Sequence, residues 1–245
     1  YMEYISGYQL AATPEETIAI NAASLATPFA VDDKKVLDTF ENRKKVLLCD
    51  KENRSYTYEV EVNRAGLYSM TIDYYPLPSR YNEITLKVEL NGKLPFEEAE
   101  ELGLERVWEY DSSIQRDNRG NDLLPTQSVV KAWHSKTLTD SYGTLDKPLK
   151  FYLSEGKNTL TITTTAADFY LGGITFSNSP EQLTYEQYLQ SAPKAVQEPK
   201  GVLIEIEGEN PSSRSHSMIN PVYDRSPATS PSDPVKSRYN TIGGQ

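Results

Sequence analysis

The segment 108–122 groups aromatic rings with planar polar side chains more densely than any other part of the sequence. An aromatic ring can stack on the CH face of a sugar, while Asn, Asp and Arg side chains exchange paired hydrogen bonds with its hydroxyl groups. The segment therefore predicts a carbohydrate-binding loop, with a structural loop whose Asp and Asn side chains hold turns as the alternative. The candidate ligand-binding residues are Trp108, Tyr110, Arg116, Asp117, Asn118, Arg119, Asn121, Asp122 and, beyond the segment, Trp133.

The same segment also offers hard oxygen ligands, at Asp117, Asn121 and Asp122. Ca²⁺ is bound in proteins by such carboxylate and amide oxygens, although the spacing here is not that of an EF-hand loop. A structural Ca²⁺ site at these three residues is therefore a third interpretation. No other cofactor is expected.

Two further loops are candidates for a binding surface. The segment 140–142 follows the pair Trp133-His134 and could lie near the same rim, although a tryptophan in this position is commonly a core residue. The segment 74–81 is rich in tyrosine and proline, and its prolines equally favour a fixed turn.

Catalytic motifs are missing from the sequence. It contains no Gly-x-Ser-x-Gly elbow, no His pair at metal-binding spacing, no phosphate loop and no dinucleotide fingerprint. The single cysteine, Cys49, lies in an apolar stretch and is predicted to be a small buried hydrophobe, since a catalytic thiol would need a base and only His134 and His216 exist. Carboxylates are plentiful, but a glycosidase pair usually occupies a larger cleft than this chain is expected to form. We therefore expect no enzyme.

The charge of the chain limits its partners. The formal net charge is −10 and the pI is about 4.8, and the Lys and Arg residues are scattered singly along the sequence. Without a basic stripe, nucleic acid and anionic membrane surfaces are not expected partners. No apolar run approaches the roughly 20 residues of a membrane-spanning helix. No signal peptide is evident at Tyr1, which leaves a trimmed chain and a cytosolic protein as alternatives.

Apolar residues alternate with polar ones in several runs, which is typical of strands with one solvated face. The runs 55–62 and 66–74 are predicted to form a hairpin. The run 84–90 ends at Asn91-Gly92, a strong turn signal, after which Leu94 and Phe96 are expected to return along it. The remaining expectations are a short helix over 96–102, a loop over 109–127, and strands over 128–133, 149–153, 158–164 and 169–176.

About eight strands joined by turns, with no long amphipathic helix between them, predict two antiparallel sheets packed face to face. The predicted fold class is therefore all-β, an antiparallel β-sandwich of the jelly-roll type with short helical linkers.

An internal repeat gives the domain organisation. The string YMEYI at 1–5 reappears as YEQYL at 185–189, and TIAIN at 17–21 reappears as LIEIE at 203–207. The sequence therefore predicts a helical linker over 1–16, a sandwich module over 17–178, a second linker over 179–200, and the start of a second, incomplete copy of the module over 201–245.

Particular strings carry a resemblance to a known family. NRAGLY (63–68), DYYP (73–76), NGKLPFEEA (91–99) and DNRGND (117–122) resemble a galactose-binding-like sandwich module of bacterial extracellular solute-binding proteins of carbohydrate ABC importers. YDRSPAT (223–229) and NTIGG (240–244) resemble the opening of the second module of that family. The resemblance implies a surface-anchored extracellular lipoprotein with two kinds of partner, an oligosaccharide or polysaccharide and, through the parent protein, a membrane permease.

A second resemblance concerns calcium. IEIEGEN (204–210) is similar to the first strand of family 6 and family 35 carbohydrate-binding modules, in which acidic residues can ligate a structural Ca²⁺. The matching string in the complete module, IAINA (18–22), lacks those acids. Three hypotheses result: a non-catalytic sugar-binding or sugar-presenting module, a structural spacer or docking module without ligand, and an accessory module of a secreted glycoside hydrolase.

Overall fold

The computed structural model of the chain describes residues 1–26, 35–50, 55–79, 83–123, 125–145, 147–178 and 184–191, together with the isolated positions 205, 212 and 213. The chain divides into two compact units. The first unit contains Tyr1–Arg106 and Val129–Pro211, and the second contains Val107–Ser128 and Ser212–Gln245.

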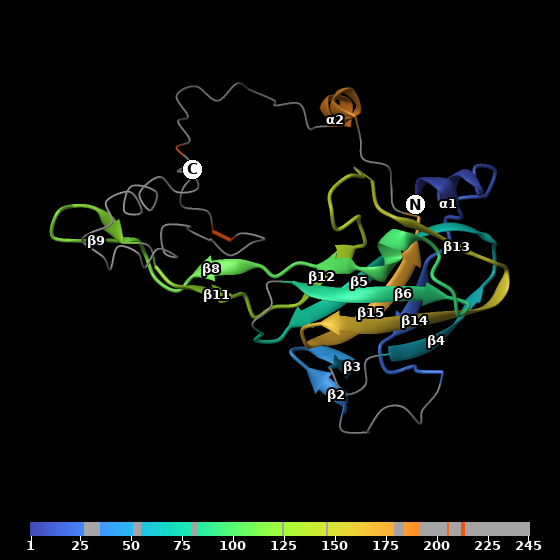
Figure 1. Ribbon diagram of the computed structural model, residues 1–245, viewed down its shortest axis with the longest axis horizontal. Helices are drawn as coiled ribbons and strands as arrows, with labels where there is room; N and C mark the ends of the chain where they lie inside the picture. Colours follow the sequence, from blue (N-terminus) through green and yellow to red (C-terminus); the bar gives the residue numbers. More distant parts are fainter. Residues whose placement is uncertain are drawn as a thin grey trace, which may run out of the picture. The chain divides into compact units, whose positions relative to one another are not determined.

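The first unit contains two antiparallel sheets, whose strands are labelled in Figure 1. The seven-stranded sheet has the order β12-β5-β15-β3-β2, with β1 on β15 and β13 on β5, and the four-stranded sheet has the order β4-β14-β6-β7. The strands of the larger sheet are β1 (Ile18–Asn21), β2 (Val36–Phe40), β3 (Arg43–Cys49), β5 (Gly66–Pro76), β12 (His134–Thr137), β13 (Lys150–Leu153) and β15 (Phe169–Ser177). Those of the smaller sheet are β4 (Ser55–Val62), β6 (Ile84–Leu90), β7 (Leu102–Leu104) and β14 (Gly156–Ala166).

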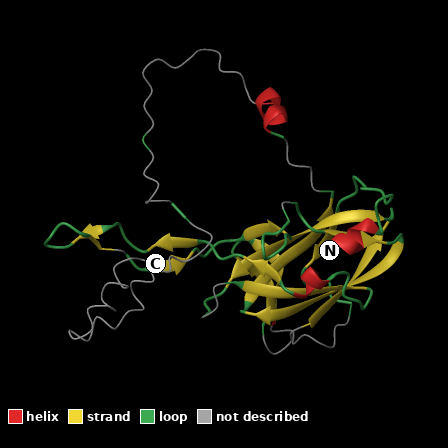
Figure 2. Ribbon diagram, turned by 45° about the horizontal axis from the view of Figure 1, so that its top comes forward, coloured by secondary structure: helices red, strands yellow, loops and turns green. Residues whose placement is uncertain are grey.

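One hydrophobic core lies between these sheets. In β4, the alternate residues Tyr56, Tyr58, Val60 and Val62 are buried, as the sequence pattern predicts. The inward residues of β5, β15 and β6 join the same cluster. Strands make up most of the regular structure of this unit, and the helices are short (Figure 2). The predicted all-β antiparallel β-sandwich is therefore confirmed.

The predicted hairpin of 55–62 with 66–74 is wrong. β4 pairs with β14 in the smaller sheet, whereas β5 pairs with β15, β12 and β13 in the larger one. The connection at 63–65 therefore crosses from one layer to the other. Both strands bury one face, as the alternation predicts, but a hairpin and a crossover between layers produce the same alternation.

Other boundaries also differ from the predictions. Four short strands lie in or overlap the expected loop over 109–127: β8 (Trp108–Tyr110), β9 (Gln115–Arg116), β10 (Asp122–Leu123) and β11 (Gln127–Val129). They belong to the second unit, except for Val129 at the end of β11, which belongs to the first. Of the expected strand over 128–133, only residues 128–129 are in a strand, as the end of β11, and β12 begins directly after the expected range, at His134. The Asn91-Gly92 turn is confirmed by positive φ angles of 51° and 72°, but the strand that pairs with β6 beyond it is β7, not residues 94–96.

Helices are few among the described residues. α1 (Met2–Ser6) lies within the expected linker 1–16, the 3₁₀ helix η3 (Glu97–Glu100) lies where a short helix was expected, and α2 (Tyr185–Ser191) lies within 179–200. None of the described helices is long and apolar enough to cross a membrane. The predicted second copy over 201–245 lies outside the described residues, apart from three isolated positions.

Cys49 is fully buried in the core, which confirms the prediction of a small buried hydrophobe. Burial raises the pKa of its thiol well above the usual value, and the nearby Asp50 carboxylate acts in the same direction. A thiol held neutral in this way is a poor nucleophile.

Tyrosines packed in or against the core predict a loss of stability at alkaline pH. Burial raises the pKa of Tyr4 to about 12, although a hydrogen bond from the Tyr152 N–H partly offsets this rise. Burial also raises the pKa of Tyr68 to about 12, and the Glu16 carboxylate adds to the effect. Because a tyrosine in the unfolded chain ionises near pH 10, these groups contribute stability that is complete below about pH 10 and is lost as the pH rises through about 12.

The measurement is an alkaline titration followed by circular dichroism and by tyrosinate absorbance. We expect the chain to unfold between about pH 10 and 12 and Tyr4 and Tyr68 to ionise together with unfolding. Ionisation of every tyrosine near pH 10 in a protein that keeps its folded spectrum would contradict this expectation.

Candidate functional site

The predicted binding segment 108–122 is built from two short antiparallel pairs in the second unit. Trp108 and Tyr110 lie on β8, which pairs with β11, and both side chains are partly buried. β9 pairs with β10 through Arg116–Asp122 and Gln115–Leu123; residues 115–116 and 118–121 are exposed, and Asp117 is partly buried. The exposed candidate residues of this turn are Arg116, Asn118, Arg119 and Asn121.

Asp117 holds the β9–β10 turn. Its Oδ1 accepts hydrogen bonds from the backbone N–H groups of Arg119, at 2.8 Å, and Asn121, at 2.9 Å. Its Oδ2 accepts a hydrogen bond from the Asn121 side-chain amide at 2.9 Å. The pKa of Asp117 is lowered chiefly by that side-chain bond. Asp117 and Asn121 therefore have a structural role in this turn, as the alternative interpretation of the segment predicts.

The calcium interpretation stays a prediction. Among the described residues no group of three or more His, Cys, Asp or Glu side chains is placed to hold a metal ion. Both oxygens of Asp117 already accept hydrogen bonds within the turn. The side chain of Asp122, the third proposed ligand, lies outside the described residues.

Trp133 belongs to a different group of rings, in the first unit. Its ring lies 5.7 Å from that of Tyr75 and 6.2 Å from that of Phe40, both in edge-to-face geometry. Phe40 also contacts Tyr75 at 5.0 Å and Tyr170 at 4.3 Å. We call Phe40, Tyr75, Trp133 and Tyr170, together with Arg43 and Asp73, the aromatic face.

The aromatic face lies on the side of the seven-stranded sheet that points away from the core. Tyr74 on β5 and Phe169 and Leu171 on β15 are core residues, so their neighbours Tyr75 and Tyr170 point to the opposite side. Tyr75 and Tyr170 are directly paired across β5 and β15. Cross-strand aromatic pairs of this kind stabilise a sheet, which is the structural alternative to a binding role. Phe40, Trp133 and Tyr170 are nonetheless partly exposed.

An ion pair completes the aromatic face. The Arg43 guanidinium donates to the Asp73 carboxylate at 2.6 Å, and its Cζ lies 4.9 Å from the centre of the Trp133 ring. The two charged side chains remain 38% and 28% exposed. The face thus combines a hydrogen-bond donor and an acceptor with aromatic rings, and it carries no net charge among its named residues.

Gly172 makes room for Trp133. A Cβ atom at this position would lie 2.8 Å from Cζ3 of Trp133 and 3.3 Å from Cδ of Arg43. The pairing of β15 with β5 shifts by one residue here, between Leu171 and Gly173. The bulge and the missing side chain together allow the indole ring to approach the backbone of β15.

The segment 140–142 forms a separate depression, also in the first unit. Asp140 is buried and accepts hydrogen bonds from the N–H groups of Tyr142 and Thr144, whereas the Tyr142 ring is 75% exposed. The depression has a volume of about 400 Å³. It is lined by Glu97, Glu98, Glu100, Glu101, Asp140, Tyr142 and Thr144.

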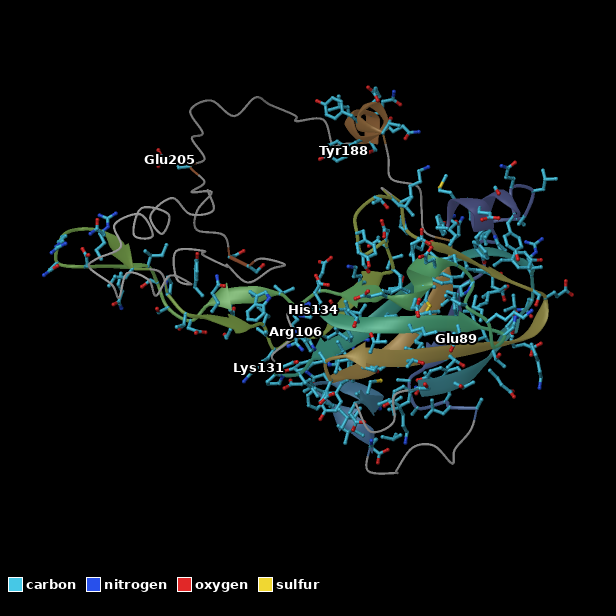
Figure 3. All side chains as sticks on the ribbon, in the orientation of Figure 1. Glu89, Arg106, Lys131, His134, Tyr188 and Glu205 are labelled. Carbon is cyan, nitrogen blue, oxygen red and sulfur yellow. The ribbon has the colours of Figure 1, made fainter. Side chains whose placement is uncertain are left out.

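The structure therefore separates the predicted site residues into two groups. Trp108, Tyr110 and Arg116–Asp122 belong to the second unit, and Trp133 belongs to the aromatic face of the first unit. Of the segment 74–81, Tyr75 joins the aromatic face, whereas Tyr74 points inward and donates to the Glu105 carbonyl. Figure 3 labels two neighbours of this region, His134 at the start of β12 and the buried Arg106, which donates to the Leu77 carbonyl.

Sequence reasoning missed Phe40, Arg43 and Tyr170. Tyr170 lies between the inward residues Phe169 and Leu171, so the alternation of β15 alone places it on the outer face. No comparable signal existed for Phe40 and Arg43. They flank a turn at Glu41-Asn42, both with positive φ, that lacks the glycine typical of two-residue hairpin turns.

No protein-family model and no curated protein matches the sequence. Solved structures are similar at low identity. A family 35 carbohydrate binding module from Clostridium thermocellum is 11% identical over 67% of this chain and 99% of that chain, with a TM-score of 0.40. A CBM35 from Cellvibrio japonicus Abf62 is 12% identical over 66% and 92%, with a TM-score of 0.38.

A GH26-CBM35 β-(1,4)-mannanase from Podospora anserina is 14% identical, with a TM-score of 0.39. The match covers 69% of this chain but only 29% of the mannanase. The scores of all three structures are low, so the fold assignment rests on the strand pairing described above.

Proposed function

We propose that the sandwich is a non-catalytic carbohydrate-binding module and that the aromatic face is its ligand platform. The observation that carries the proposal is the grouping of three partly exposed rings, Phe40, Trp133 and Tyr170, on the outer side of the sheet. Rings at the surface of a rigid sheet offer a flat apolar area on which the CH face of a sugar can stack.

The ion pair supplies the polar part of the platform. Arg43 offers N–H donors and Asp73 offers acceptor oxygens, both beside the Trp133 ring and both partly exposed. A sugar hydroxyl can accept from the first and donate to the second. Because the named charges cancel, the platform suits a neutral oligosaccharide or polysaccharide better than a polyanion.

We further propose that the module belongs to an extracellular solute-binding lipoprotein that serves a carbohydrate ABC importer. The support is the resemblance of the strings at 63–68, 91–99, 117–122 and 223–229. In this proposal the parent protein is anchored at the cell surface, and its partners are the glycan and the membrane permease. The module captures or presents glycan and performs no chemistry on it.

The experiment is calorimetric titration of the full chain with a panel of plant and microbial glycans, followed by Tyr170→Ser on any glycan that binds. Loss of a stacking ring is expected to weaken binding about tenfold, since one aromatic contact is worth roughly 1.5 kcal/mol. The matched control is Tyr142→Ser, which removes a more exposed tyrosine outside the aromatic face. This control is expected to leave the affinity unchanged.

Three outcomes would contradict parts of the proposal. If no glycan binds, the structural spacer is the remaining function. If Tyr170→Ser binds normally and Trp108→Ala does not, the ligand site lies in the segment 108–122. If the parent polypeptide carries a hydrolase domain, the module is an accessory of a glycoside hydrolase and the importer context is wrong.

A further inference from the structure

α1 is attached to the sandwich by two tyrosine hydroxyl groups. Tyr1 Oη accepts a hydrogen bond from the backbone N–H of Lys150 at 3.0 Å, and Tyr4 Oη accepts one from the N–H of Tyr152 at 2.7 Å. Both N–H groups belong to β13, which pairs with β5 only among the described strands. The helix therefore satisfies donors on the open edge of the sheet, which would otherwise face solvent.

Aromatic contacts reinforce this attachment. The rings of Tyr1 and Tyr4 lie 5.0 Å and 5.1 Å from that of Phe96. Tyr8, just beyond the helix, stacks on Tyr152 at 4.3 Å. Two tyrosines three residues apart lie on the same side of a helix, so one helical turn is enough to present both hydroxyl groups to the strand.

α2 resembles α1 in sequence, but its matching side chains are more exposed. Tyr185 and Tyr188 have the spacing of Tyr1 and Tyr4, and Leu189 takes the place of Ile5. The three side chains of α2 are 70%, 59% and 52% exposed, whereas Tyr1, Tyr4 and Ile5 are partly buried. Figure 3 labels Tyr188 on this helix. α2 thus carries the same kind of side chains that attach α1 to the sandwich, but they contact no strand among the described residues.

The order of the repeat indicates what the partner is. α1 packs on the module that follows it in the chain, whose first strand is β1. The string that matches β1, LIEIE at 203–207, follows α2 at nearly the same distance, 18 residues after Tyr185 compared with 16 after Tyr1.

We propose that Tyr185, Tyr188 and Leu189 of α2 dock on the edge strand of a second β-sandwich that follows α2 in the same polypeptide. The Tyr185 and Tyr188 hydroxyl groups accept hydrogen bonds from two alternate backbone N–H groups of that strand. Each such helix fixes the orientation of a module relative to the linker before it. This role is independent of glycan binding.

The first test asks whether the α2 sequence can dock at all. In the full chain, Met2→Glu, Glu3→Gln, Ile5→Leu and Ser6→Gln convert α1 to the α2 sequence and keep both tyrosines. We expect the amides of Lys150 and Tyr152 to remain protected from hydrogen exchange in this variant. Adding Tyr4→Ser to the same variant is expected to lower their protection factors about tenfold. If the variant that keeps Tyr4 loses as much protection as the variant with Tyr4→Ser, the proposal is overturned.

The second test asks whether α2 docks on a following module. A tandem chain carries residues 17–178 directly after residue 200, so that the second sandwich has no α1 of its own. In the second sandwich, we expect the amides equivalent to Lys150 and Tyr152 to be protected from hydrogen exchange. The double substitution Tyr185→Ser and Tyr188→Ser is expected to lower their protection factors about tenfold. The same double substitution in the 245-residue chain is expected to leave the first sandwich unchanged. If these amides stay protected after the double substitution, the proposal is overturned. It is also overturned if they are not protected in the tandem chain without substitutions.

Discussion

Replacing Phe151 with Ala is expected to lower the free energy of unfolding by about 3–5 kcal/mol. Phe151 is fully buried on β13 and is paired with the buried Tyr68 on β5. Its ring lies 5.2 Å from that of Phe96, which follows β6 of the smaller sheet. The substitution removes a ring where the two layers meet, and close-packed surroundings can fill the cavity only in part.

The measurement is urea denaturation of both proteins, with Tyr142→Ala as the matched control. Because the Tyr142 ring is 75% exposed, its removal is expected to change the free energy of unfolding by less than about 0.5 kcal/mol. A loss below about 1 kcal/mol for Phe151→Ala would mean that the two sheets do not share a packed core at this position.

Replacing Gly172 with Ala is expected to weaken glycan binding about tenfold. The added Cβ would lie 2.8 Å from Cζ3 of Trp133, closer than two carbon atoms can approach, so the indole ring and the Arg43 side chain must move. The overpacking is also expected to cost about 1–3 kcal/mol of stability. Affinity is measured by calorimetry with a glycan from the panel, and stability by urea denaturation.

Gly173→Ala is the matched control, one residue further along β15. Its added Cβ would meet only the Ile20 carbonyl oxygen, at 3.4 Å. The affinity of this variant is expected to stay within about twofold of the parent protein. Normal glycan binding by Gly172→Ala would contradict the assignment of Trp133 to the binding platform.

The fold class could be predicted because alternation reports directly which side of a strand is buried. Tyr56, Tyr58, Val60 and Val62 form the inward row of β4, and Ile84, Leu86, Val88 and Leu90 form that of β6, as predicted. Alternation does not report the partner of a strand. β4 and β5 are neighbours in sequence and bury one face each, yet their partners are β14 and β15, about 100 residues away.

The candidate site was harder to predict for the same reason. Trp133 and Tyr75 lie in segments that the sequence predicts to bind ligand. The aromatic face also needs Phe40 and Tyr170, whose contact depends on the strand order β5-β15-β3-β2 of the sheet. Rings that are far apart in sequence give no local signal of their grouping. In contrast, the structural alternative for Asp117 was predictable, because an Asp that bonds the N–H groups two and four residues later is a local turn motif.

The central claim, that glycan binds on the aromatic face, can be tested through the two indole N–H signals of the chain. The sequence contains only two tryptophans, Trp108 and Trp133, so each signal in a proton–nitrogen NMR spectrum can be assigned with one substitution. During titration with a glycan we expect the Trp133 signal to shift in a saturable manner and the Trp108 signal to stay in place. A shift of Trp108 alone, or of neither signal at any glycan concentration, would contradict the claim.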